Sequence, residues 1–422
     1  MAIETPPRPL PIRIMNLGYR GARLARAHPL RLRKYALMDR ASRRAGGLTD
    51  FGDPRFEKGL EHLIDSIEDE DRLNGFGRVL AASHITNLLR QRLLITEYVR
   101  RHPEIRDEII EKPIFIIGAP RTGTTITQYL LSQDERFRYP ITWECDELYP
   151  PLNPATMLSD PRIKRSEKQI RRTLSLAPDL DAATPIGARE AQECALLHAH
   201  AFRSETFHVM FNCQAYDRWL AEQDRTWVYQ EQKLLLQYMQ SGGLRPMESW
   251  LLKSPPHMDN IDKILTVFPD ARFITTYREP TEVVASACSL SGTIIGMVED
   301  NVDWHDHGRH IRWRTSSMLA RNVELRRHYV DRSTQFIDFP MGRMVREPMA
   351  CVQEVYKHFD IDLTQQTYQK MSRFMDERGV GKRKQHIYHA EDYGLDIDEL
   401  WPELQYYRDF YGIEEKRERS IQ

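Results

Sequence analysis

The stretch that decides the fold is Ile114-Phe115-Ile116-Ile117-Gly118-Ala119-Pro120-Arg121-Thr122-Gly123-Thr124-Thr125. Four consecutive apolar residues run into Gly118, and Gly123 and two threonines precede a helical pattern. A buried strand that turns into a helix through glycines is typical of a phosphate-binding loop, in which backbone N–H groups and the positive end of the helix hold an anion. In the G-x-x-x-x-G-K-[ST] frame of nucleoside triphosphatases, Thr124 replaces the lysine, and the cation lies within the loop at Arg121. The loop therefore predicts a phosphorylated donor other than a nucleoside triphosphate.

A second segment has the same strand-to-helix layout. Residues 271–277 form an apolar pattern that ends at Arg278-Glu279-Pro280, and a helical pattern starts at once. Proline suits the first turn of a helix. Ser286 follows Arg278 by eight residues, about two turns along that helix. Guanidinium and hydroxyl groups both donate hydrogen bonds, so these two side chains predict a second phosphate contact.

With these residues the chain resembles the sulfotransferases that use 3′-phosphoadenosine 5′-phosphosulfate (PAPS). In that family the 5′-phosphosulfate loop reads P-[KR]-[ST]-G-T-T, as residues 120–125 do here. The 3′-phosphate segment reads R-[DE]-P with a serine eight residues after the arginine, as residues 278–286 do. The resemblance is to the bacterial branch and covers roughly residues 35–412. Its other parts are residues 75–97, Trp143-Glu144, residues 250–255, residues 382–388 and Gly394-Leu395.

The resemblance implies a role for each matching residue. Arg121 is expected to stabilise charge on the leaving phosphate, and Lys253 to place a second cation on the transferred group. The residues implied to bind the donor are Pro120, Arg121, Thr122, Gly123, Thr124, Thr125, Arg278, Ser286, Lys382 and Arg383, the last two in a basic loop with Lys384. Sulfuryl transfer by this logic needs positioning, charge stabilisation and a base. PAPS is the expected co-substrate, and no metal is expected because the sequence has no Walker-B-type aspartate.

The general base is the least determined part of the site. Cytosolic members of the family place a histidine two residues after the strand lysine, where this chain has Pro255. The protein-tyrosine branch uses a glutamate about twenty residues after the loop, which makes Glu144 the first candidate for a catalytic base. The alternatives are Glu190, Glu193, His198 and His257.

Apolar strands that alternate with helices predict an α/β fold with a P-loop-like parallel sheet and helices on both faces. The expected strands are residues 113–117, 250–254, 272–276 and 335–339. Ligands bind at the carboxyl ends of such strands, so Arg121, Lys253 and Arg278 are expected to meet over one site.

The rest of the chain is predicted to be largely helical. We expect a helical N-terminal region at 1–110 packed on the core, a sulfotransferase domain at 111–412 with a helical insertion at about 160–245, and a tail at 413–422. Other expected helices are residues 56–67, 76–98, 123–133, 257–268, 280–290, 347–359, 364–377 and one near 396–410, with an ordered loop at 139–151.

Composition excludes several classes of protein. Among the 422 residues the formal net charge is −1, so no overall field indicates a nucleic-acid partner. The sequence has no secretory apolar segment, and its five cysteines form no C-x-x-C pair, which favours a reducing compartment and a cytoplasmic location. Between Arg8 and Arg44 there are eleven lysines or arginines and one acid, Asp39. This arm is either a membrane-surface helix or a solvated arm, and Pro29 with several glycines favours the second.

The combined interpretation is an enzyme that moves a sulfuryl group from PAPS to a hydroxyl or amine of a small-molecule, lipid or carbohydrate acceptor. A kinase-like enzyme with a degenerate loop is the first alternative, and the missing lysine counts against it. A non-catalytic binding protein on the same fold is the second, and the presence of Arg121 counts against it. Acceptor and oligomeric state stay open at this point.

Overall fold

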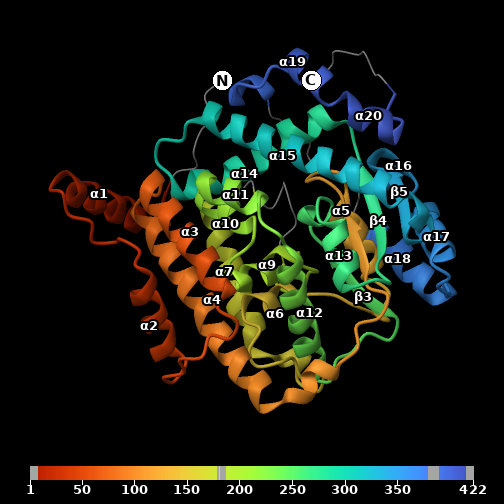
Figure 1. Cartoon of the computed structure of the whole chain (residues 1–422), viewed down its shortest axis with the longest axis horizontal. Helices are drawn as coiled ribbons and strands as arrows, with labels where there is room; N and C mark the ends of the chain where they lie inside the picture. The colour runs from red at the N-terminus through yellow and green to blue at the C-terminus, as the bar shows by residue number, and fades with distance from the viewer. Residues whose placement is uncertain (1–7, 178–179, 181–186, 379–388, 415–422) are drawn as a thin grey trace.

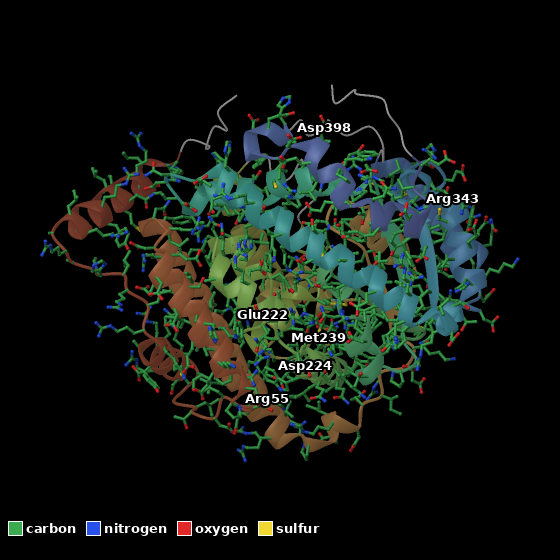
Figure 2. All side chains as sticks on the ribbon, turned by 45° about the horizontal axis from the view of Figure 1, so that its top comes forward. Arg55, Glu222, Asp224, Met239, Arg343 and Asp398 are labelled. Carbon is green, nitrogen blue, oxygen red and sulfur yellow. The ribbon has the colours of Figure 1, made fainter. Side chains whose placement is uncertain are left out.

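A computed structural model describes residues 8–177, 180, 187–378 and 389–414, and Figures 1 and 2 show the chain in two orientations. Its centre is a five-stranded sheet in the order β2-β3-β1-β4-β5, and every pair of neighbours is parallel. The strands are β1 (Ile114–Ile117), β2 (Phe137–Arg138), β3 (Ser249–Lys253), β4 (Arg272–Tyr277) and β5 (Phe336–Pro340). Ile116 of β1 lies opposite Lys253 of β3 and Ile274 of β4, so the carboxyl ends of these strands share one edge.

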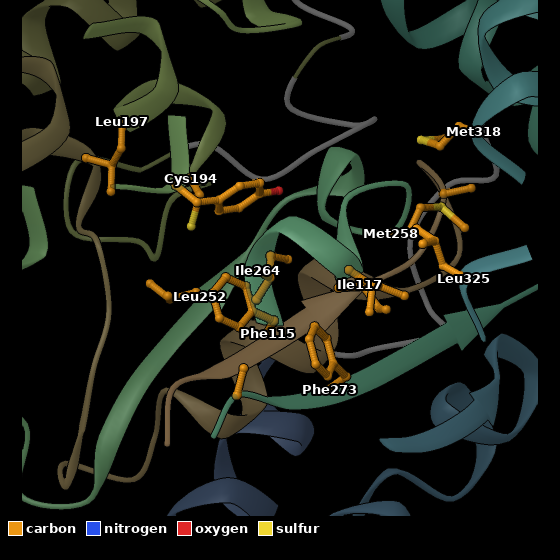
Figure 3. Packing of buried hydrophobic residues seen from close by; sticks show 14 of the residues in the cluster. Phe115, Ile117, Cys194, Leu197, Leu252, Met258, Ile264, Phe273, Met318 and Leu325 are labelled. Carbon is orange, nitrogen blue, oxygen red and sulfur yellow. The ribbon is translucent and has the colours of Figure 1, made fainter. Parts of the chain in front are cut away.

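All four residues of β1 are buried because helices cover both faces of the sheet. Phe115 and Ile117 point to one face and pack with Leu252, Phe273 and Met258, as Figure 3 shows. Ile114 and Ile116, one pleat apart, belong to the core on the opposite face. The first face is covered by helices that include α12 (Thr226–Ser241), α13 (Ile261–Val267) and α14 (Pro280–Val298), and the second by α5 (Thr124–Leu131), α17 (Pro348–His358) and α18 (Gln365–Arg378). The predicted two-sided parallel sheet is confirmed.

The expected strands occur within one residue of their predicted bounds, whereas several other elements differ. Strand β2 has two residues, too few for a periodic signal, and the expected ordered loop contains α6 (Thr142–Asp146). The expected helix at 257–268 starts as a 3-10 turn at Pro255–His257 before α13. The expected helix near 396–410 is two helices, α19 (Ile397–Glu403) and α20 (Gln405–Tyr411), with Pro402 in the last turn of the first. Proline has no N–H to continue a helix.

A second core lies beside the sheet domain, and we call the helices around it the helical layer. Its N-terminal members are α2 (Lys34–Arg44), α3 (Arg55–Glu70) and α4 (Gly75–Arg101), which pack on η3 (Ala199–Ala201), α10 (Thr206–Phe211) and α11 (Gln214–Ala221). Met297 and Val298, at the end of α14, join this core. Helix α15 (Trp304–His328) runs next to α14, so these two long helices connect the helical layer to the sheet (Figure 1).

Helix α14 is the one described helix long and apolar enough to cross a membrane by length and composition. Of its apolar window, 72% is buried inside the fold. Its apolar side chains therefore serve the two cores that it connects.

Candidate functional site

The loop between β1 and α5 has the backbone shape of an anion-binding loop. Gly118 has a φ of 151°, and a Cβ there would lie 2.4 Å from the backbone oxygen of Thr276 on β4. Only glycine allows this approach. Gly123, with a φ of 96°, is the N-cap of α5 and has no side chain to accept from the N–H groups of the first turn. The loop therefore lies close against β4 and leaves the start of α5 for an anion.

Arg121 stands at the turn of this loop in a left-handed conformation, with a φ of 69°. Such a conformation is uncommon for arginine and costs on the order of 1 kcal/mol, so the surrounding loop must hold it. The Nε atom of Arg121 donates to Oγ of Ser286 at 3.3 Å. The cation of the first predicted phosphate contact thus touches the serine of the second, although 165 positions separate them in sequence.

Lys253 ends β3 at the same sheet edge and is 3% exposed. Its Nζ atom lies 2.5 Å from Oε1 of Glu193 and 3.3 Å from Oγ1 of Thr125 in the first turn of α5. A buried ammonium needs an anionic partner, and Glu193 supplies it. The side chain of Glu193 is 35% exposed, so this carboxylate is reachable from solvent while it contacts the loop's lysine.

The position of Glu193 depends on a segment that is only partly helical. Glu190, Cys194 and His198 have the four-residue spacing of one helical face, but the helix α9 begins only at Ala195 (Ala195–His198). The backbone N–H of Cys194 donates to the carbonyl of Lys253 at 2.9 Å. This non-local bond extends the end of β3 and fixes the neighbouring Glu193 beside the lysine.

Arg278 follows β4, and its Nε donates to Oε2 of Glu282, one turn into α14, at 2.6 Å. Ser286 is buried on the same helix. Glu279 caps α14 by accepting from the N–H of Thr281. Glu279 also accepts from Nη2 of the buried Arg408, on α20, at 2.7 Å. Arg408 was not predicted from the sequence, where nothing distinguishes it from other arginines.

Glu144, the first candidate for the base, lies elsewhere. It is 1% exposed on α6, and both carboxylate oxygens accept from Nη2 of Arg138 on β2 at 2.6 Å. The guanidinium of Arg138 also lies 5.0 Å from the ring centre of Trp250. Trp143, the neighbour of Glu144 in the sequence, packs against the guanidinium of Arg162. This geometry favours a structural ion pair over the predicted role as a base.

The other candidates also differ in their surroundings. His198 and His257 are fully buried, with hydrogen bonds to Gln232 at 2.7 Å and to Tyr229 at 3.0 Å. Burial lowers the pKa of His198 to about 4 and the pKa of His257 well below its ordinary range. Both are therefore weak bases beneath the site. Glu190 pairs through its backbone oxygen with the N–H of Thr142 on α6. Lys382, Arg383 and Lys384 lie outside the described residues.

Among the described residues, one group has side chains of the kind that bind metals: His208, Asp217 and His310. It lies in the helical layer, on α10, α11 and α15, and Nε2 of His310 is 2.8 Å from Oδ2 of Asp217. That distance is a hydrogen bond, and the group shares no element with the loop at Arg121.

Known proteins resemble this chain in sequence and in fold. The family model described as "Sulfotransferase family" matches residues 113–365. The crystal structure of sulfotransferase STF9 from Mycobacterium avium superposes with a TM-score of 0.82 at 29% identity, covering 90% of this chain and 96% of that one. STF1 from Mycobacterium tuberculosis gives a TM-score of 0.78 at 25% identity, covering 89% and 99%.

Among curated proteins, the omega-hydroxy-beta-dihydromenaquinone-9 sulfotransferase Stf3 of Mycobacterium bovis is 23% identical over 315 residues, which are 70% of this chain and 74% of that protein. The family model spans more than half of the chain and includes β1, the loop, β3, β4 and β5. The chain belongs to the sulfotransferase family.

Proposed function

We propose that this sulfotransferase takes the sulfuryl group from PAPS and delivers it to a hydroxyl of a lipid-like acceptor. The observation that carries the donor assignment is the 3.3 Å contact between Arg121 and Ser286. It brings the loop at the start of α5 and the Arg278 segment into one site, as a donor with phosphates at both its 3′ and 5′ positions requires. The open first turn of α5 fits the 5′-phosphate.

Different residues of the site have different roles in sulfuryl transfer. An acceptor oxygen attacks sulfur as the bond from sulfur to the bridging oxygen breaks, and the electron pair leaves with adenosine 3′,5′-bisphosphate. Arg121 stabilises the charge that grows on this leaving group. Lys253 donates to the transferred group from the end of β3. Pro120, Thr122, Gly123, Thr124 and Thr125 form the loop that positions the phosphate.

We assign the general base to Glu193. Its carboxylate is the exposed partner of a pair whose other member, Lys253, lies 3.3 Å from Thr125 in the loop. When the lysine turns towards the anionic donor, the Glu193 carboxylate loses its ion-pair partner and becomes available to the acceptor hydroxyl. Glu193 then accepts the acceptor's proton as the new bond forms.

The acceptor class rests on the named relative, which acts on an omega-hydroxy group of a menaquinone derivative. Because that similarity is 23% identity over 70% of this chain, we propose for this enzyme only the shared chemistry, a hydroxyl on an apolar molecule. We also propose a cytoplasmic location, which the five buried cysteines without disulfides support.

Calorimetry with two nucleotides tests the donor. Adenosine 3′,5′-bisphosphate should bind at least tenfold more tightly than ATP, because each charge-assisted hydrogen bond to the 3′-phosphate contributes about 1.5–3 kcal/mol. Ser286→Ala should reduce this difference in affinity, whereas Ser316→Ala, which changes a serine of α15 that donates to Glu403 on α19, should preserve it. Equal affinity of the wild type for both nucleotides would contradict the donor assignment.

A matched pair of glutamates tests the base. Glu193→Gln should lower kcat by about 10²–10⁴ and leave the affinity for adenosine 3′,5′-bisphosphate intact. Glu144→Gln should instead lower the free energy of unfolding by about 3–5 kcal/mol, because it leaves Arg138 buried without its partner, and keep the kcat of the folded fraction. The reverse pattern would restore Glu144 as the base.

A further inference from the structure

Helix α1 (Leu10–Leu24) lies at the edge of the molecule in both whole-chain views (Figures 1 and 2). Its inner side is fixed to the helical layer. Asn16 and Tyr19 are its two buried residues, and Oδ1 of Asn16 accepts from the N–H of Phe76 on α4 at 2.9 Å. The ring of Tyr19 lies 5.7 Å from the guanidinium of Arg78. The helix is thus held in a defined orientation on the protein.

The outer side of α1 is apolar and uncovered. Leu10, Ile14, Leu17 and Leu24 are 64%, 62%, 71% and 87% exposed. Their spacing of four, three and seven residues places them on one stripe. At about 100° per residue the stripe spans about 80° and faces away from Tyr19. These four residues are therefore one continuous surface, unlike single exposed leucines scattered over a protein.

Cations flank this stripe, and acids are absent from it. Helix α1 contains no aspartate or glutamate, and Arg13 is exposed next to the stripe. Arg20 and Arg23 point to the body and pair with Asp300 and Asp71. The connection to α2 adds Arg26, Arg31 and Arg33, all exposed. Asp39, the one acid among the eleven cations between Arg8 and Arg44, pairs with Arg43 at 2.6 Å.

The sequence favoured a solvated N-terminal arm because glycines and a proline were expected to interrupt its helix, and the structure does not show that interruption. Glycines at 18 and 21 were expected to interrupt a helix, and so was Pro29. Helix α1 is continuous through both glycines and ends at Leu24, before the proline. An amphipathic helix with one exposed apolar face and cations beside that face is typical of helices that lie in a membrane interface.

We propose that the outer face of α1 docks on the surface of a bilayer that contains anionic lipids, with the helix parallel to the membrane plane. The stripe would enter the boundary between head groups and acyl chains, and Arg13 and the cations after Leu24 would contact the lipid phosphates. A second copy of this chain is a poorer occupant, because two such faces would bring their arginines together. The proposal stands on α1 alone and does not depend on the identity of the acceptor.

Vesicle co-sedimentation tests this surface with the full-length enzyme. The wild type should bind vesicles of phosphatidylcholine with phosphatidylglycerol, bind pure phosphatidylcholine far more weakly, and lose binding as salt rises. The double variant Ile14→Ser/Leu17→Ser should weaken binding about tenfold or more, because burial of each apolar side chain drives insertion. Its turnover of a water-soluble hydroxyl acceptor should equal that of the wild type.

The matched control is Leu158→Ser/Met247→Ser, whose targets are 79% and 81% exposed outside α1. It should bind vesicles like the wild type. Equal binding by the α1 variant and this control would overturn the proposal, and so would equal binding of the wild type to both kinds of vesicle. Sedimentation velocity is the second readout: a wild-type dimer that the α1 variant dissociates would assign the face to a second copy instead.

Discussion

The sheet edge and the helical layer both bury titratable groups, but the helical layer adds a set of buried histidines to paired charges such as Arg78 with Glu68. At the sheet edge the buried charges are retained and paired: Lys253 with Glu193, Arg408 with Glu279, Arg138 with Glu144. In the helical layer, burial is the main cause that lowers the pKa of His200 and of His208 to about 3 each. A paired cation can turn from its carboxylate partner to an anionic substrate, whereas a neutral histidine carries no charge that could bind one. The first arrangement suits catalysis, and the second serves packing.

Acidification should affect the helical layer most and have the largest effect of all. The pKa of His84, on α4, is lowered by burial to about 4 from 6.5, so unfolding takes up protons as the pH falls. With the two histidines at about 3, each contributes about 1.4 kcal/mol per pKa unit, and the free energy of unfolding should fall by several kcal/mol between about pH 6.5 and pH 4. Above about pH 6.5 these histidines are neutral in both the folded and the unfolded state, so they should not change the free energy of unfolding there.

Urea unfolding at a series of pH values measures this loss. His200→Gln replaces one of the histidines by a group that does not titrate, so its curve should be less steep than that of the wild type. A free energy of unfolding that stays level down to about pH 4 would remove the contrast between the two regions.

Replacing Arg121 should have the next largest effect, confined to the sheet edge. Arg121→Ala removes a cation whose contact strengthens in the transition state, so kcat should fall by about 10²–10³. The pH dependence of unfolding should match that of the wild type. Steady-state kinetics measures kcat, and Arg245→Ala, a replacement of an exposed arginine paired with Glu108, is the control. A kcat within a few-fold of wild type would refute the assigned role.

Arg278→Ala should have a smaller effect of a different kind. It removes a contact to the donor's 3′-phosphate that exists in the ground state, worth about 1.5–3 kcal/mol, so the donor KM should rise about 10- to 100-fold with little change in kcat. Glu282→Gln is the informative partner, because it takes away the carboxylate that holds Arg278 at 2.6 Å and should not raise KM. A fall in kcat with unchanged KM would place Arg278 at the reacting group.

A chelator should have the smallest effect of all, both on turnover at the sheet edge and on the melting temperature, which would report a metal in the helical layer. Turnover should persist because the loop residues supply the charge that a metal would otherwise provide. The melting temperature should also persist if His310 and Asp217 form only their 2.8 Å hydrogen bond. Full and reversible loss of transfer would favour the kinase-like alternative, and a lowered melting temperature alone would assign a metal to His208, Asp217 and His310.

Local patterns predicted four of the five strands, the loop and the places of Arg121, Lys253, Arg278 and Ser286. Each of these depends on residues adjacent in sequence, such as the apolar run before Gly118. Glu193 could be offered only as one of several candidates, since its place depends on the bond between the Cys194 N–H and the Lys253 carbonyl, 59 positions apart in the numbering.

Glu144 shows how spacing along the chain can suggest a role that the structure does not favour. Its distance from the loop along the chain resembles that of a known base, but its partner Arg138 belongs to a strand of two residues that no periodicity reveals. Spacing along a chain therefore predicts a role only where local structure carries the residue to the site. Helix α1 is a third example, because glycine content predicted an interruption that packing on α4 prevents.

The bond between Glu279 and Arg408 also sets an order of assembly. A ribosome makes Glu279 129 positions before its partner, and the carboxylate at the head of α14 has to wait for α20. Until α20 emerges, the growing polypeptide carries every residue of both phosphate contacts and still lacks the arginine that pairs with Glu279. The second contact is therefore completed only after Arg408 has been made, which delays nucleotide capture until that point in synthesis.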